Sequence, residues 1–144
     1  MAERLFSQED RQKIIGAIQA AEMQTSGEIQ VHIENHCKGE VLDRAAEVFE
    51  TLKMYQTQER NGVLFYLAVV DHKFAILGDG GINSRVESDF WEKSKDLMAQ
   101  HFRQGQFTQG LIAGIEQAGL QLSKHFPYNP DNDKNELSDD ISFG

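Results

Sequence analysis

The side chains that could do chemistry in this 144-residue chain gather around one apolar stretch. Residues 63–70 form an unbroken apolar run, and residues 73–77 form a second run directly after the polar pair Asp71-His72. Two apolar runs joined by a short polar turn are typical of an antiparallel hairpin. With this two-residue turn, the polar and glycine-rich residues beyond the two far ends of the hairpin meet at one edge of the sheet.

The residues that meet there have the chemistry of a hard-cation site. The predicted pairing places Asp79 opposite Leu64, beside Arg60 and Asn61. Glu28 begins a segment that we expect to run parallel to the first apolar run, so it starts at the same end. Ca²⁺ and Mg²⁺ prefer carboxylate, amide and main-chain oxygens. The sequence therefore predicts a cation site formed by Glu28, Asn61, Gly78, Asp79 and Gly80.

Two neighbours of this set, Arg60 and Ser26, are candidates for holding a phosphate or another ligand. A guanidinium suits a phosphate, but a serine nucleophile needs an activating base, and no His or Lys is placed near Ser26. No nucleophile elbow, P-loop or dinucleotide fingerprint is present, so the catalytic residues stay unknown. The alternative is that these residues only form turns, because Asn-Gly and Asp-Gly pairs are common in loops.

His32 and His36 are four residues apart, a spacing that suits zinc ligands on a helix. The residues around them predict a strand followed by a loop. We therefore expect His32 to be a surface residue and His36 to lie loose in the loop.

The C-terminal segment carries a partial calcium-loop pattern. Asp131, Asp133 and Asn135 match the first three ligand positions. Glu136 stands where such a loop needs glycine, and Ser142 stands where it needs a bidentate glutamate, so an EF-hand is excluded. A weak cation contact or a solvated tail is expected instead.

Composition limits the function further. Hydrophobic residues make up 40% and charged residues 26% of the chain, as in ordinary soluble proteins. The net charge of −9 argues against a nucleic-acid surface and favours cations or basic partners. The single cysteine, Cys37, rules out an internal disulfide. No apolar run approaches the roughly 20 residues of a membrane span, so a cytoplasmic location without a direct membrane span is expected.

Hydrophobic periodicity predicts the order α-β-α-β-β-α-α. Apolar residues recur at helical spacing over 7–24 and 42–52, then over 84–102 and 107–125. Residues 28–34 alternate, which predicts a half-buried strand at an edge or with one solvated face. The hairpin needs cover on both faces, so we expect a three-layer α/β/α sandwich around a small mixed sheet.

Two local signals refine the last two helices. Ser84 followed by Glu87 fits a capping box that opens the third helix. Gly110 and Gly114 lie one turn apart in the last helix and would let a neighbour come close.

The domain organisation follows from composition. Residues 1–127 form one expected domain, and Pro127 and Pro130 end its regular structure. Residues 128–144 are acidic and predict a mobile or loosely docked tail.

Four separated segments, in this order, resemble the TPM domain, the family of thylakoid acid-phosphatase-like and photosystem-repair proteins. They are residues 25–31, 60–64 and 78–82, and residues 102–107 together with Gly110. The resemblance covers about Phe6 to Phe126. It is strongest to the short bacterial members with a tryptophan in the third helix, here Trp91.

The resemblance implies an α/β/α sandwich, an acidic cleft and divalent-cation binding. It also implies a disputed phosphatase activity that some members lack. Our leading hypothesis is a Ca²⁺- or Mg²⁺-binding accessory or regulatory module. The alternatives are a metal-assisted phosphatase, with Asp79 or Glu28 as ligand or base and Arg60 holding the phosphate, and a protein-interaction module that uses the acidic tail.

Overall fold

The computed structural model describes residues 2–130 and 136–144, and its centre is a mixed sheet with the strand order β3-β2-β1-β4. β1 pairs in parallel with β2 and β4, whereas β2 and β3 form the antiparallel hairpin. The strands are β1 (Glu28–Glu34), β2 (Gly62–Ala68), β3 (Lys73–Gly78) and β4 (Ser142–Phe143). The helices are η1 (Ala2–Leu5), α1 (Gln8–Glu22), α2 (Val41–Thr51), α3 (Gly80–Asn83), α4 (Glu92–Arg103) and α5 (Phe107–Leu122).

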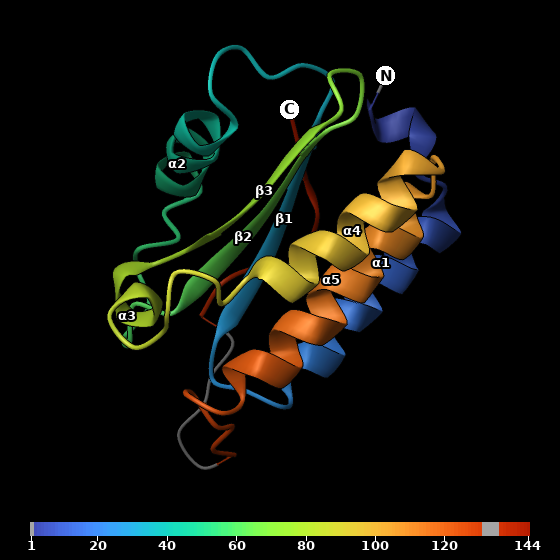
Figure 1. Cartoon of the computed structure of the whole chain (residues 1–144). Coiled ribbons are helices and arrows are strands. Elements are labelled where there is room, and N and C mark those ends of the chain that lie inside the picture. The colour runs from blue at the N-terminus through green and yellow to red at the C-terminus, as the bar shows by residue number, and fades with distance from the viewer. Residues whose placement is uncertain (1, 131–135) are drawn as a thin grey trace.

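Helices cover both faces of this sheet (Figure 1). α1, α4 and α5 pack on one face, where the odd-numbered side chains of β1 and β2 join the larger core. α2 packs on the other face, against Leu64, Tyr66 and Ala68 of β2. The predicted three-layer α/β/α sandwich with a small mixed sheet is confirmed. The described order adds η1, α3 and β4 to the predicted elements.

Local signals explain the two longest helices. Ser7 caps α1: its hydroxyl accepts the N–H of Asp10 at 3.0 Å, and the Asp10 carboxylate accepts the N–H of Ser7 at 3.3 Å. In α5, a Cβ on Gly110 would lie 2.4 Å from Cε1 of Phe102. A Cβ on Gly114 would lie 2.5 Å from Sδ of Met98. The predicted close approach is therefore made by side chains of α4.

Strand β1 has the predicted bounds but not the predicted solvated face. Glu28, Gln30, His32 and Glu34 are only 4–8% exposed. β1 lies between β2 and β4, and the chain segment 136–144 covers its polar face in place of water. The prediction of an edge strand or a solvated face was wrong, and so was the surface location predicted for His32. Alternation alone does not show what covers the polar side of a strand.

The same segment differs from the loose tail that its composition predicts. Ser142 and Phe143 pair with His32 and Ile33 as β4, and Ile141 and Phe143 pack against the larger core. Residues 131–135, which carry the partial calcium-loop pattern, lie outside the described part of the chain.

The hairpin forms, but its predicted register is wrong by two residues. Ala68 pairs with Lys73, so residues 69–72 make a four-residue turn. The N–H of Val69 donates to the Glu34 carbonyl, which extends the backbone contact along β1 instead of β3. As a result, Asp79 lies beside Gly62, where its N–H donates to the Gly62 carbonyl at 2.9 Å.

The capping box predicted at Ser84 is also wrong. Asp79 caps the short α3, and Ser84 ends it. α4 begins only at Glu92. In the described residues no helix has the length and apolar composition that crossing a bilayer requires.

Candidate functional site

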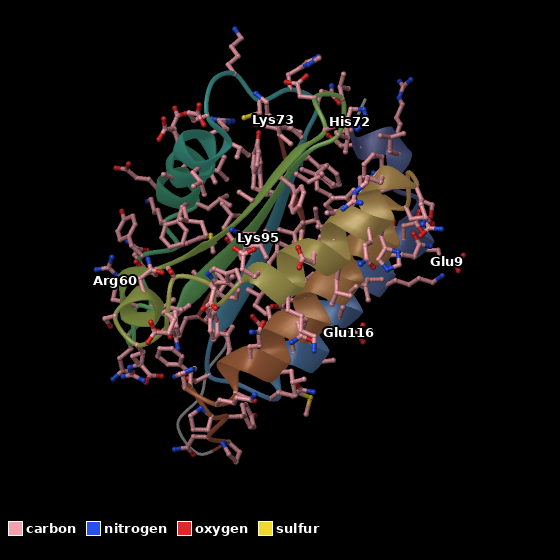
Figure 2. All side chains as sticks on the ribbon, in the orientation of Figure 1. Glu9, Arg60, His72, Lys73, Lys95 and Glu116 are labelled. Carbon is pink, nitrogen blue, oxygen red and sulfur yellow. The ribbon has the colours of Figure 1, made fainter. Side chains whose placement is uncertain are left out.

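At the open end of the hairpin, the predicted ligand Asp79 is held by Arg60. Nε of Arg60 donates to Oδ2 of Asp79 at 2.7 Å, and Nη2 donates to Oδ1 at 2.8 Å. Oδ1 also accepts the N–H of Gly80 at 2.7 Å. Figure 2 shows Arg60 beside α3. Both oxygens of this 6%-exposed carboxylate are therefore engaged inside the protein, and so is the arginine expected to hold a phosphate.

Asn61 and Ser26 lie together and form a link between β1 and β2. Nδ2 of Asn61 donates to the Ser26 hydroxyl at 3.3 Å, and the Asn61 carbonyl accepts the N–H of Glu28 at 3.2 Å. The Ser26 hydroxyl donates to Oε2 of Glu59 at 2.9 Å. Oδ1 of Asn61 is buried and has no partner in the described residues. The group that accepts the Ser26 proton is an exposed carboxylate, and one orphaned amide oxygen beside this pair does not complete a catalytic site.

The glycine-rich loop 78–81 uses its main-chain oxygens locally and is tightly packed at Gly81. The Gly78 carbonyl accepts a hydrogen bond from Nδ2 of Asn83 at 3.1 Å, and the Gly80 carbonyl accepts the N–H of Ser84 at 3.1 Å. A Cβ on Gly81 would lie 2.1 Å from the Glu59 carbonyl oxygen, so only glycine fits there. The main-chain oxygens predicted as ligands are thus used within the loop.

As the side chains lie, this predicted set does not fit a cation. Asp79 is neutralised by Arg60, and the carbonyls of Gly78 and Gly80 accept local hydrogen bonds. Across residues 2–130 and 136–144, no group of three or more His, Cys, Asp or Glu side chains is arranged to hold a metal ion.

Glu28, the remaining predicted ligand, belongs to a different group of carboxyls. We call Glu22, Glu28, Glu136 and Asp139 the Glu28 cluster. Oε1 of Glu28 accepts the N–H groups of Glu136 and Leu137, the latter at 3.0 Å. Glu22 accepts the N–H of Ile29 at 3.1 Å and is hydrogen-bonded to the Asp139 side chain.

Among the described residues, no base neutralises this cluster. None of its carboxylates forms an ion pair within the described part of the chain. Oδ1 of Asp139 is buried there without any partner. Burial, and then the hydrogen bond with Asp139, raise the pKa of Glu22 to about 10. Burial also raises the pKa of Glu28 to about 7, although the N–H groups of Leu137 and Glu136 act against it.

The fold brings these carboxyls together from three elements. Glu22 ends α1 and Glu28 begins β1, and the turn between them is pinned to residues 126–127. There, the N–H of Ser26 donates to the Phe126 carbonyl, and Thr25 forms an isolated bridge with Pro127. The segment that begins at Glu136 adds the other two carboxyls. No local pattern predicts this meeting, since Glu28 and the segment that begins at Glu136 are more than a hundred residues apart along the chain.

The other end of β1 holds a second buried carboxylate, Glu34. Arg44 donates to both of its oxygens, from Nε and Nη2, at 2.8 Å each. The Tyr66 hydroxyl donates to Oε2, and Nε2 of His32 lies 3.2 Å from Oε1. Burial acts to raise the pKa of Glu34, but the hydrogen bonds from Arg44, Tyr66 and His32 outweigh it and lower the pKa to about 2. Nδ1 of His32 lies 2.8 Å from the Ser142 hydroxyl, which ties the network to β4.

Sequence reasoning missed this network, and the only signal was the polar side of the alternating segment 28–34. His36 is also placed: its Nδ1 lies 2.9 Å from Oδ1 of Asp71. That contact lowers the pKa of Asp71, together with the N–H of Cys37. His32 and His36 therefore have different partners and do not act as a pair of ligands.

Known structures share this architecture. The solution structure of the BA42 protein from the psychrophilic bacterium Bizionia argentinensis is 47% identical, with a TM-score of 0.91, over 96% of this chain and 95% of that one. The N-terminal domain of the cg2496 protein from Corynebacterium glutamicum shares the fold at 15% identity and a TM-score of 0.66, over 86% of this chain and 78% of that one.

A third solution structure, the N-terminal domain of a P. gingivalis protein, has 18% identity and a TM-score of 0.69, over 87% of this chain and 82% of that one. No match was found among curated proteins. The sequence profile of the TPM domain matches residues 2–121, a range that includes β1, β2, β3 and the described helices up to the last residue but one of α5. With that match, the chain belongs to the TPM domain family.

Proposed function

We propose that this TPM-domain protein is a divalent-cation-binding module and that the ion binds at the Glu28 cluster. The observation that carries the proposal is the meeting of Glu22, Glu28 and Asp139 without a neutralising base among the described residues. Neighbouring carboxylates in a medium of low dielectric constant repel one another, so they take up either protons or an external cation. The raised pKa values of Glu22 and Glu28 correspond to the first case, in which these carboxyls hold protons and no cation is bound.

The donor set suits a hard cation. It offers carboxylate oxygens, including the orphaned Oδ1 of Asp139. Gln30 adds an amide: its Nε2 donates to the Ser138 carbonyl at 3.1 Å, and its buried Oε1 has no partner in the described residues. Because these oxygens do not form a complete ligand set as they lie, binding must exchange protons and N–H hydrogen bonds for the ion. We therefore expect a dissociation constant on the order of 10⁻⁴–10⁻³ M.

The proposal retains Glu28 from the ligand set predicted by the sequence. It does not use Asn61, Gly78, Asp79 or Gly80, whose polar atoms serve the hairpin end as described above. The metal-assisted phosphatase stays a prediction, without support from Arg60, which is paired with Asp79. The tail as an interaction module stays a prediction as well.

Thermal unfolding tests the proposal. A ligand that binds only the folded state stabilises it by RT ln(1 + [L]/Kd), so a millimolar cation at one to ten times the expected Kd contributes about 0.4–1.4 kcal/mol. We expect millimolar Ca²⁺ or Mg²⁺ to raise the Tm relative to a chelator. The double substitution Glu22→Gln with Glu28→Gln should abolish the rise, whereas Glu116→Gln, an exposed site on α5, should leave it intact (Figure 2). Identical melting curves with chelator and with cation would overturn the proposal.

A further inference from the structure

A hollow lies at the turn end of the hairpin, at the opposite end of the sheet from Asp79 and the Glu28 cluster. It has a volume of about 190 Å³ and lies where the hairpin turn meets the joint between α4 and α5. Figure 2 shows His72 at this turn, at the far end of the hairpin from Arg60. The lining residues are Leu67, His72, Phe74, Ala99, Phe102, Arg103 and Phe107.

The walls are apolar and held in place by packing. The rings of Phe74 and Phe102 meet edge to face, with centroids 5.1 Å apart, and the Phe107 ring lies 5.8 Å from that of Phe102. Gly110 makes room for Phe102, since any Cβ there would collide with the ring. A wall fixed in this way is already formed before a ligand arrives, which lowers the entropy cost of binding.

The rim carries two cationic or basic groups without a partner. In the described residues, Arg103 and His72 form no hydrogen bond or ion pair through their side chains. The carboxyl end of α4 and the amino end of α5 both lie at this joint, so their opposite dipoles offset each other. Arg103 therefore supplies a positive charge at this rim, in a chain whose net charge is −9.

We propose that this hollow binds a small apolar carboxylate, such as a phenyl-substituted short-chain acid. The hydrocarbon part would lie between Phe74, Phe102 and Phe107, and the carboxylate would pair with Arg103. The volume is below the roughly 300–1,000 Å³ of sites for drug-sized ligands, which restricts the ligand to a small one. The position agrees with the general placement of ligands beyond the carboxyl ends of parallel strands, here β1 and β2.

Amide-shift titrations of the full chain with 3-phenylpropionate and with the neutral 3-phenylpropionamide test this assignment. We expect saturable shifts at the lining residues with both probes, with the amide binding roughly tenfold more weakly because it lacks the charge-assisted contact. Arg103→Gln should weaken the acid to the level of the amide and leave amide binding unchanged. Arg4→Gln, an exposed arginine in η1, is the matched control and should change neither.

Filling the hollow gives an independent check. Ala99→Leu, on the half-buried side of α4, should abolish binding of both probes while the Tm stays close to that of the unchanged protein. The proposal is overturned if the acid and the amide bind equally. It is also overturned if the shifts lie away from the hairpin turn, or if neither probe produces shifts at tens of millimolar.

Discussion

The two ends of β1 place the same residue type in opposite electrostatic settings. Glu28 and Glu34 lie on the same face of one strand, and both are almost fully buried. At the Glu34 end, Arg44 donates to both carboxylate oxygens, and the pKa of Glu34 falls to about 2. At the Glu28 end no base is present in the described residues, and the pKa of Glu28 rises to about 7. Both carboxyls are buried, so the presence or absence of a basic partner decides whether the pKa falls or rises.

This difference separates a carboxylate whose charge is paired inside the protein from one that has no basic partner in the described residues. Glu34 receives hydrogen bonds from Arg44 and Tyr66 and lies beside His32, so its charge is fully compensated within the fold. Glu28 and Glu22 meet other carboxyls and no base among the described residues, and we propose that protons or an ion from solution balance their charge. The comparison explains why we assign the structural role to one end of the strand and the binding role to the other.

Removing Arg44, the base that pairs with Glu34, should have the largest effect on stability. Arg44→Met leaves Glu34 buried with an uncompensated charge, and we expect a loss of about 3 kcal/mol in the free energy of unfolding at neutral pH. Urea denaturation measures it. Adding Glu34→Gln to this variant should recover most of the loss, since the buried charge is then gone. If the double variant is as unstable as the single one, the arginine acts through packing and not through charge.

Removing the carboxylate at the other end should have the opposite sign. The pKa of Glu28 is about 7 in the folded protein against 4.5 in the unfolded chain, so its contribution to stability is lost as the pH rises through 7. In chelator at about pH 8.5, we expect Glu28→Gln to stabilise the protein by roughly 2 kcal/mol. At about pH 5 the two proteins should unfold at nearly the same urea concentration. A destabilising effect at the higher pH would show that Glu28 is compensated after all.

The smallest effect on stability is expected at the open end of the hairpin, where Arg60 pairs with Asp79. Arg60 is 56% exposed, so its ion pair with Asp79 resembles a surface pair. Asp79→Asn should lower stability by about 1 kcal/mol or less and leave the response of the Tm to Ca²⁺ unchanged. The reverse result, an intact stability and a lost Ca²⁺ response, would return the cation site to the set that the sequence first predicted.

Most of the fold could be predicted from local patterns in the sequence. The bounds of β1 and the cap at Ser7 follow from alternation and from side-chain chemistry within a few residues. The hairpin register failed because Val69 and Val70 look like strand residues. Their N–H groups instead pair with the backbone at and beyond the end of β1, which a local pattern does not reveal.

The site could be predicted only in part, for the same physical reason. Glu28 was identified from its place at the start of a strand. Its partners Glu22 and Asp139 come from a helix end and from a segment that composition predicts to be loose. The alternating polar face of residues 28–34 fitted contact with water as well as contact with a polar chain segment, and only the three-dimensional arrangement distinguishes them.

Proton release on cation binding tests the central claim most directly, because a cation at the Glu28 cluster must displace the protons held by Glu22 and Glu28. Calorimetric titration with Ca²⁺ at neutral pH, in two buffers of different ionisation enthalpy, counts these protons. We expect one ion to bind with the release of between about one and two protons, and we expect the release to disappear in the protein with Glu22→Gln and Glu28→Gln. Binding without proton release, or no heat of binding at millimolar Ca²⁺, would contradict the account.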